Sequence, residues 1–324
     1  MQFQQTKPPV GVVFDADFGN RIEDALALAS LYGLQGKNES RVISVSSSRP
    51  GLNSALFADT LVRFYTGDPG PFGAPTPIGL ALGNGAPDTP LMSAVLGRTE
   101  FARGIQQMND TADPVALIRN ALSAQFDANA VVVLAGPATN LAQVLDLPGA
   151  RQLITAKVRY LVAALGNLNG RSADPRVRAD LGAARKLFAE WPTPVVAAGS
   201  EIGEAVKFPA AGLDKNFAWA PLHPIVEAYR AAGAMPYDAP AASLAAALYA
   251  VRPKEGYFQL SSPGTISVDA EGRTKFTAAD NGRHRYLIAD AAKTESLQQV
   301  FVETAGTHPI PRATRFRPPQ QKKQ

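Results

Sequence analysis

Short apolar runs alternate with helical patterns along the first two thirds of the chain. The runs at residues 9–15, 41–46, 130–136, 158–165 and 194–199 are typical of buried strands. The segments between them, at 23–34, 54–67, 113–125, 139–147 and 181–191, have the apolar periodicity of helices. This alternation predicts an α/β fold, with a mainly parallel sheet flanked by helices in a Rossmann-like arrangement. Ligands of such sheets bind beyond the carboxyl ends of the strands, so we expect the functional site there.

The last third of the chain has a different pattern. Helices are expected near 222–232 and 240–251, followed by short antiparallel strands and a final helix near 292–304. We therefore expect one domain over residues 1–310, with a core at about 9–255 and a small C-terminal β-strand extension at about 256–310. A basic flexible tail follows at 311–324. Residues 68–90 are rich in Gly and Pro and predict a loop around one short strand.

The composition excludes several kinds of chemistry. The 324 residues contain no Cys and three His, so disulfides, thiolate metal sites, cysteine nucleophiles and His-rich zinc sites are not expected. A net charge of +4, partly in the tail, is too mild to favour nucleic-acid binding. The sequence holds no apolar run long enough for a membrane span. The N-terminus lacks an apolar signal core and resembles a mature one, which favours an exported or periplasmic protein over a cytoplasmic one.

Four carboxylates follow the first predicted strand within ten residues: Asp15, Asp17, Glu23 and Asp24. The period-2 geometry of a strand puts Asp15 and Asp17 on one side of the chain, and the other two acids lie in the first turn of the next helix. Acids that converge at a strand's carboxyl end suit an oxygen-ligated divalent cation. Helix capping and contacts with loop amides are the alternative, but capping accounts for only two of the four.

The segment DADFGNRIEDALALA at residues 15–29 resembles the N-terminal signature of the nucleoside hydrolase (inosine–uridine preferring) superfamily. Three later segments support the resemblance in the right order: LAGPATNL at 134–141, the Asp180 segment that continues into AARKL, and Tyr237-Asp238 ahead of LYAVRP. The similarity extends over nearly the whole chain. It implies a nucleoside hydrolase-like fold, a nucleoside-like small-molecule substrate, a place in purine or pyrimidine metabolism and a homo-oligomer.

The resemblance also implies a Ca²⁺ site. Its protein ligands would be Asp17, Asp24, the main-chain carbonyl of Thr139, and Asp238, with water and a substrate diol completing the shell. The implied reaction is hydrolysis of an N-glycosidic bond, in which Asp17 takes a proton from the metal-bound water. Asp15 would orient these ligands without itself binding the metal.

The departures from the family's pattern fall in the sugar pocket. Glu23 stands where the signature has Asp, and Asp174-Pro175-Arg176 stands where relatives carry Glu-x-Asn. Tyr237 stands where the shorter subfamily has a His that protonates the leaving base. The pocket residues carried over are Glu23, Asp174, Arg176 and Tyr237, together with Asn167 and Asn169.

Arginines also stand at pocket positions, and they leave two interpretations open. In one, Arg21, Arg49 or Arg176 meets an anionic group of a modified substrate, and the chain is an N-glycosyl hydrolase. In the other, the chain keeps the fold and the metal but has lost or altered its activity, and serves as a ligand-binding or scaffold protein. His223 and His284 are expected to be structural.

Overall fold

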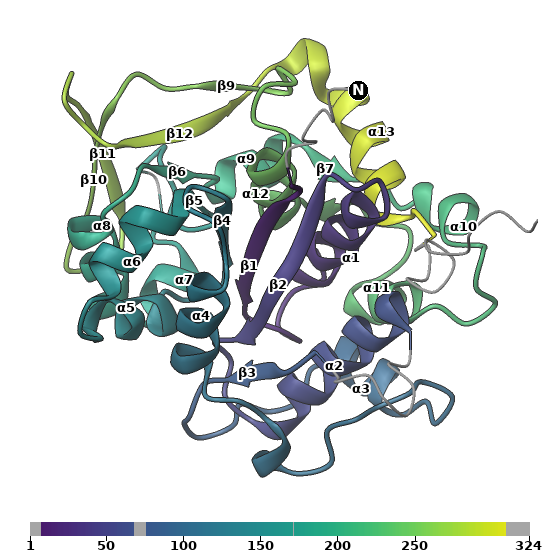
Figure 1. Cartoon of the computed structure of the whole chain (residues 1–324). Coiled ribbons are helices and arrows are strands. Elements are labelled where there is room, and N and C mark those ends of the chain that lie inside the picture. The colour runs from purple at the N-terminus through teal and green to yellow at the C-terminus, as the bar shows by residue number, and fades with distance from the viewer. Residues whose placement is uncertain (1–7, 68–75, 171, 309–324) are drawn as a thin grey trace, which may run out of the picture.

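A computed structural model describes residues 8–67, 76–170 and 172–308 of the chain. The predicted basic tail at 311–324 lies outside these residues, as does the first part, 68–75, of the Gly- and Pro-rich stretch at 68–90. The architecture is the predicted one, a mostly parallel central sheet with helices on both faces (Figure 1).

Six parallel strands form the centre of the sheet. They are β1 (Val10–Ala16), β2 (Ser40–Ser47), β3 (Ile78–Leu80), β4 (Ala130–Ala135), β5 (Val158–Ala163) and β6 (Val195–Ala197). Their spatial order is β6-β5-β4-β1-β2-β3. β1 is central and pairs in parallel with β2 and β4, so its carboxyl end is surrounded by loops from both neighbours.

The C-terminal extension continues the same sheet. β12 (His284–Ala289) pairs in parallel with β6, and β10 (Gly264–Val268) and β11 (Thr274–Ala278) follow in antiparallel order. β9 (Phe258–Leu260) pairs with β12, while β7 (Lys207–Phe208) and β8 (Ala239–Pro240) form a separate two-stranded ribbon.

Thirteen α-helices are assigned among the described residues, more than the pattern alone predicted. They are α1 (Ile22–Gly36), α2 (Leu52–Thr66), α3 (Pro90–Leu96), α4 (Pro114–Ser123), α5 (Thr139–Asp146), α6 (Ala150–Lys157), α7 (Pro175–Ala179), α8 (Leu181–Glu190), α9 (Ser200–Ala205), α10 (Gly212–Asn216), α11 (Pro224–Ala232), α12 (Ala242–Val251) and α13 (Thr294–Ala305). Several missed helices, such as α7 and α9, are only five or six residues long, too short to show a period. Within the described part of the chain, no helix is long and apolar enough to cross a membrane.

The sheet separates two apolar cores. Alternate residues of β4 enter different cores, with Val131 and Val133 on one side and Val132 and Leu134 on the other. α1 lies in the first core and is buried over nearly its whole length, because α12 and α13 cover the faces that the sheet leaves open. Burial on all sides explains why its sequence is apolar almost throughout.

Gly33 marks the closest approach between α1 and α13. A Cβ atom built on Gly33 would lie 1.9 Å from the carbonyl oxygen of Thr304, which is backbone and cannot rotate away. We therefore expect Gly33→Ala to destabilise the fold by about 1–3 kcal/mol, as overpacking does. Gly36→Ala is the matched control, because no atom lies within 4 Å of the new methyl group. Equal unfolding free energies for the two variants in urea would contradict this packing.

His223 is structural, as expected. Its Nδ1 accepts a hydrogen bond from the backbone N–H of Ile225 at 3.2 Å, and its ring packs against Phe64, Phe217 and Trp219. Burial lowers the pKa of His223 from 6.5 to about 3, so the ring stays neutral in the native state and takes up a proton only on unfolding.

The contribution of His223 to stability should therefore fall as the pH drops below 6.5, by about 2 kcal/mol between pH 6.5 and 5, since each pH unit below the unfolded pKa contributes about 1.4 kcal/mol. The raised pKa values of the buried Asp15 and Asp24 act in the opposite direction, so the measurement compares variant with wild type. His223→Asn keeps a capping acceptor without a titrating ring, so its unfolding free energy should gain about 2 kcal/mol relative to wild type between pH 6.5 and 5. His308→Asn, at an exposed position, should keep the wild-type slope. Identical slopes for His223→Asn and wild type would refute this assignment.

Candidate functional site

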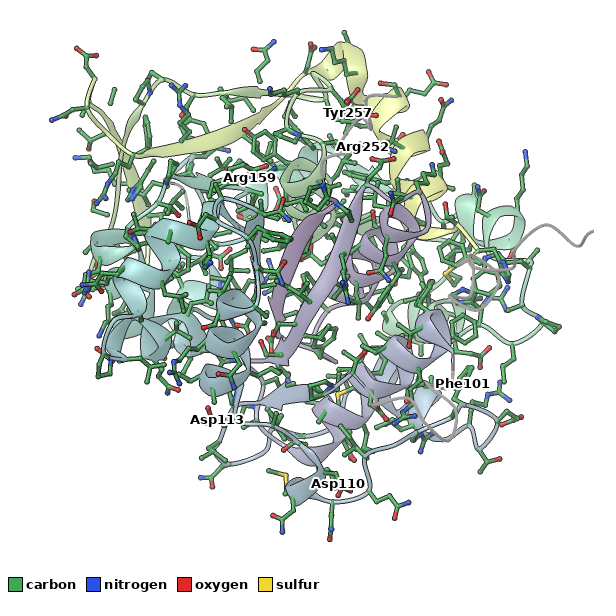
Figure 2. All side chains as sticks on the ribbon, viewed as in Figure 1. Phe101, Asp110, Asp113, Arg159, Arg252 and Tyr257 are labelled. Atoms are coloured by element: carbon green, nitrogen blue, oxygen red, sulfur yellow. The ribbon has the colours of Figure 1, made fainter. Side chains whose placement is uncertain are left out.

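The acidic segment after β1 lies at the carboxyl edge of the sheet, as predicted. In Figure 2, Arg159 near the amino end of β5 and Asp113, the N-cap of α4, lie on opposite sides of the molecule. The site is built from the β1–α1 turn, the ends of β2 and β4, and the N-terminal turns of α7 and α12.

Asp15 ties three elements together beneath the site. It is completely buried, and its Oδ1 accepts hydrogen bonds from Ser46 Oγ of β2 at 2.6 Å and Asn140 Nδ2 of α5 at 2.8 Å. Burial raises the pKa of Asp15 to about 7, against the lowering effect of these two bonds, and the neighbouring Asp17 charge adds to the increase. Asp15 thus holds strand ends in register and does not reach solvent.

Asp17 follows the end of β1 and is more exposed than Asp15. It is 8 % exposed, and its Oδ2 accepts a hydrogen bond from Asn20 Nδ2 at 2.6 Å. The turn requires Gly19, whose φ of 87° is in the left-handed region and whose hydrogen faces Met92 at a distance that no Cβ could occupy. The tight turn fixes the Asp17 carboxylate, which is the most exposed of the four acids.

Glu23 and Asp24 form a buried cluster with Arg176, which comes from α7. Arg176 Nη2 donates to Glu23 Oε1 at 2.7 Å and to Asp24 Oδ1 at 3.0 Å, and it is also 3.0 Å from Ser243 Oγ. Ser243, near the start of α12, donates from its hydroxyl to Asp24 Oδ1 at 2.7 Å and from its backbone N–H to Glu23 Oε2 at 3.2 Å. All four residues are buried, with Arg176 only 3 % exposed.

The electrostatics of this cluster are dominated by burial. Desolvation raises the pKa of Asp24 to about 7, against the opposing positive charge of Arg176. Although burial acts to lower the pKa of Arg176, the charges of Glu23, Asp24 and Asp174 hold it above its usual value, so the guanidinium remains a cation. Asp24 Oδ2 and Arg176 Nε are buried without a hydrogen-bond partner among the described residues, a pattern found at functional sites.

Asp174 caps α7 and fixes the position of Arg176. Its Oδ1 accepts the backbone N–H groups of Arg176 at 2.8 Å and Val177 at 3.3 Å. Burial raises the pKa of Asp174 above its ordinary value. This carboxylate therefore orients the arginine instead of facing a ligand.

The loop before Thr139 packs against the end of β1. A Cβ on Gly136 would lie 2.7 Å from the backbone nitrogen of Asp17, so this loop contacts the acidic turn directly. Thr139 begins α5, and its hydroxyl donates to Asp180 Oδ2 at 2.7 Å. The structure thus places this predicted loop at the predicted edge.

Asp238 is bonded at the β7–β8 ribbon and makes no hydrogen bond to the acidic cluster among the described residues. It is exposed, and its Oδ1 accepts a hydrogen bond from the backbone N–H of Ala210 at 2.9 Å, next to the β7–β8 ribbon. Tyr237 stacks on Tyr229, with 4.7 Å between the ring centroids, and donates its hydroxyl to the carbonyl of Tyr229 at 2.9 Å. These contacts hold both residues of the predicted aromatic-Asp motif at the ribbon. The residue that reaches Asp24 from this part of the chain is Ser243.

Asn167 and Asn169 lie in the loop after β5. Asn167 Nδ2 donates to Ser200 Oγ at 3.0 Å, and its Oδ1 accepts the backbone N–H of Asn169 at 3.2 Å. The Asn169 side chain is exposed. Of the predicted pocket residues, Asn169 therefore remains open to a ligand, whereas Glu23, Asp174 and Arg176 are engaged with one another.

Two further arginines lie nearer solvent. The Arg21 side chain is 31 % exposed, with its Nη1 3.8 Å from Glu23 Oε1. Arg49 Nη2 donates to the carbonyl of Pro87 at 2.6 Å. The Arg49 residue also lines a cavity of about 230 Å³, together with Ser54, Asp88 and Met92. Met92 also lies against Gly19 of the acidic turn, although none of the four acids lines this cavity.

The residues present do not fit the implied calcium site. Among the described residues, no group of three or more Asp, Glu or His side chains is arranged to hold a metal ion. Asp24 is engaged by a guanidinium and a hydroxyl, and the expected Asp238 accepts a bond at the ribbon. Asp17, Asp24 and one carbonyl would give a hard cation few of the six to eight oxygens it needs.

Sequence reasoning missed Ser243, Ser46 and Asn140 as partners of the acids. Ser243 had a usable signal, since it is a polar residue near the start of the otherwise apolar helix ASLAAALYAV. A polar group in a helix buried on all sides needs a hydrogen-bond partner, and the nearest candidates are charged residues at the sheet edge.

The comparisons with known proteins agree on the fold. No family model and no curated protein sequence matches the chain. A purine-preferring ribonucleoside hydrolase from Gardnerella vaginalis matches in structure with a TM-score of 0.68 and 17% identity, over 92% of this chain and 99% of that one. An inosine–uridine preferring nucleoside hydrolase from Bacillus anthracis matches with a TM-score of 0.63 and 14% identity, over 91% and 99%.

The type III effector protein XopQ, solved in complex with adenosine diphosphate ribose, matches with a TM-score of 0.63 and 14% identity, over 94% and 96% of the two chains. The chain therefore has a nucleoside hydrolase-like fold, as its motifs predicted. Its mainly parallel sheet with flanking helices is the architecture of that fold.

Proposed function

We propose that this chain hydrolyses the N-glycosidic bond of a nucleoside or a related ribosyl compound at the carboxyl edge of its sheet. The observation that carries the proposal is Asp17, the most exposed of the four acids and one with no ion pair to Arg176. The nucleoside hydrolase-like fold supports this reaction class, because the matched structures include hydrolases of purine and of inosine–uridine nucleosides.

In this proposal Asp17 is the general base. Its carboxylate takes the proton from a water molecule, whose oxygen attacks the anomeric carbon as the bond to the leaving base breaks. Asn20 donates to one carboxylate oxygen and fixes its orientation. Positive charge develops on the sugar ring in the oxocarbenium-like transition state, and the base leaves with the electron pair of the broken bond and takes up a proton from solvent.

A ligand of this site would contact side chains that are open to solvent. Asn169 and Arg21 are exposed enough to contact it, and Arg21 would favour a compound with an anionic group. A nucleotide or another phosphorylated ribosyl compound therefore belongs beside plain nucleosides in any substrate test. Arg176 plays no such part, because its charge is directed at Glu23 and Asp24.

A ligand-binding protein without turnover is the second candidate. The buried Arg176 favours it, because the guanidinium engages the two acids that the resemblance assigned to the metal and the sugar. The match to XopQ, solved with adenosine diphosphate ribose, supports trying that compound as a ligand.

Release of free base and sugar from a panel of nucleosides, nucleotides and adenosine diphosphate ribose, resolved by chromatography because the last compound is itself a reducing sugar, separates the two candidates. Hydrolysis predicts free sugar from at least one compound. Calorimetric binding of a compound that releases no sugar would instead establish the binding role.

A further inference from the structure

Three groups meet one atom of Arg176 in the interior of the site. Its Nη2 lies 2.7 Å from Glu23 Oε1, 3.0 Å from Asp24 Oδ1 and 3.0 Å from Ser243 Oγ. These oxygens come from α1 and α12, elements far apart in sequence that pack against each other. The positive charge therefore lies at the junction of two helices that both present oxygens towards it.

A divalent cation bound to Asp24 would lie close to this guanidinium even if it used Oδ2, which has no partner among the described residues, because both oxygens belong to one carboxylate. The Asp24 Oδ1 atom already accepts from both Arg176 and Ser243, so a metal there would face a buried positive charge a few ångströms away. Like charges at that separation in a low-dielectric interior repel strongly, and Arg cannot lose its proton to relieve the conflict. Asp174 caps α7 and accepts the backbone N–H of Arg176, which fixes the position from which the arginine side chain extends.

We infer that Arg176 is a built-in cation that neutralises the acidic cluster in place of a divalent metal, so that the chain folds and binds its ligand without calcium. The inference concerns the metal and does not depend on whether the chain hydrolyses its ligand. A chain with the proposed activity could fail this test, and an inactive one could pass it. Arg176 is a positioning residue here, since it acts through Glu23 and Asp24.

The wild-type chain gives the direct test. Purified in calcium-containing buffer and then desalted, it should carry far less than one calcium ion per chain by elemental analysis. Its Tm should be the same in millimolar calcium chloride and in EDTA, because a ligand that does not bind the native state cannot stabilise it. Stoichiometric calcium, or a Tm that rises with calcium and falls with EDTA, would overturn the inference.

A pair of variants tests the exchange of one cation for the other. Arg176→Ala combined with Ser243→Asp removes the guanidinium and puts a third carboxylate next to Asp24. This double variant should be less stable than wild type in EDTA and should gain Tm on addition of calcium. Ser243→Asp alone keeps Arg176 and should show no calcium response.

The outcomes are distinct. A calcium response in the double variant but not in Ser243→Asp supports the exchange, as does a double variant that folds only in calcium. A calcium response of Ser243→Asp as large as that of the double variant, or a folded double variant that ignores calcium, would contradict it. If the double variant does not fold in either buffer, the wild-type calcium measurement decides the question alone.

Discussion

Asp17→Asn should lower the rate of N-glycosidic bond hydrolysis by about 10²–10⁴-fold, the range that general-base catalysis contributes. The amide is nearly the same size as the carboxylate and still accepts the hydrogen bond from Asn20, so the turn around Gly19 should keep its shape. What it cannot do is take a proton from water. The loss should therefore appear in kcat, measured as released sugar at saturating substrate, with the Tm nearly unchanged.

Asp238→Asn is the matched control for this result. The resemblance made both acids ligands of one ion, whereas the structure places Asp238 at the β7–β8 ribbon, bonded to Ala210. We expect the control to keep its rate within about twofold, because it changes no group at the site and an Asn oxygen still accepts the backbone N–H. Equal losses in the two variants would favour the shared-ion arrangement over ours.

Arg176→Met should cost about 3–5 kcal/mol of unfolding free energy, the usual penalty for removing one partner of a buried ion pair. Its side chain is 2 % exposed, and its loss would leave Glu23 and Asp24 buried with uncompensated charge. The comparable substitution Arg230→Met breaks an exposed pair with Asp214 and should cost less than about 1 kcal/mol. Urea unfolding followed by circular dichroism measures both.

A cost below that of the control would contradict a central structural role for Arg176. Combining Arg176→Met with Glu23→Gln should recover part of the loss, because one of the two stranded charges is then absent. No recovery in the double variant would place the cost in lost packing instead of charge.

Much of the fold could be predicted from local pattern. The apolar runs gave the central strands because residues buried on both faces of a parallel sheet form near-continuous apolar segments, as β1 and β4 do. The edge that carries the site followed from Asp15 and Asp17 at the end of β1, since the carboxyl ends of parallel strands collect at one edge. Short helices such as α7 were missed because they span little more than one turn.

The contents of the site were less predictable, because they depend on contacts between distant segments. Arg176 lies 153 residues from Glu23, and nothing in the sequence near either residue says that their side chains meet. One of the two interpretations from sequence has Arg21, Arg49 or Arg176 meet a ligand's anionic group, whereas the structure directs Arg176 at the protein's own acids.

The difference between Asp238 and Ser243 has a similar cause. An acid after an aromatic residue resembles a family motif, whereas a Ser in an alanine-rich helix attracts no notice. The packing of α12 on α1 determines which of the two reaches Asp24, and that packing is a tertiary feature. A polar residue inside a wholly buried helix is the one local signal that favoured Ser243.

Sugar release by the wild-type chain, measured in EDTA and in calcium on the same substrate panel, tests the central claim most directly. The claim is that Asp17 hydrolyses a ribosyl N-glycosidic bond in a site whose cation is Arg176. It predicts that the wild-type chain releases sugar from at least one compound at the same rate in EDTA and in calcium, and that Asp17→Asn loses this release. Release that requires calcium would contradict the role of Arg176, and no release from any compound would contradict hydrolysis itself.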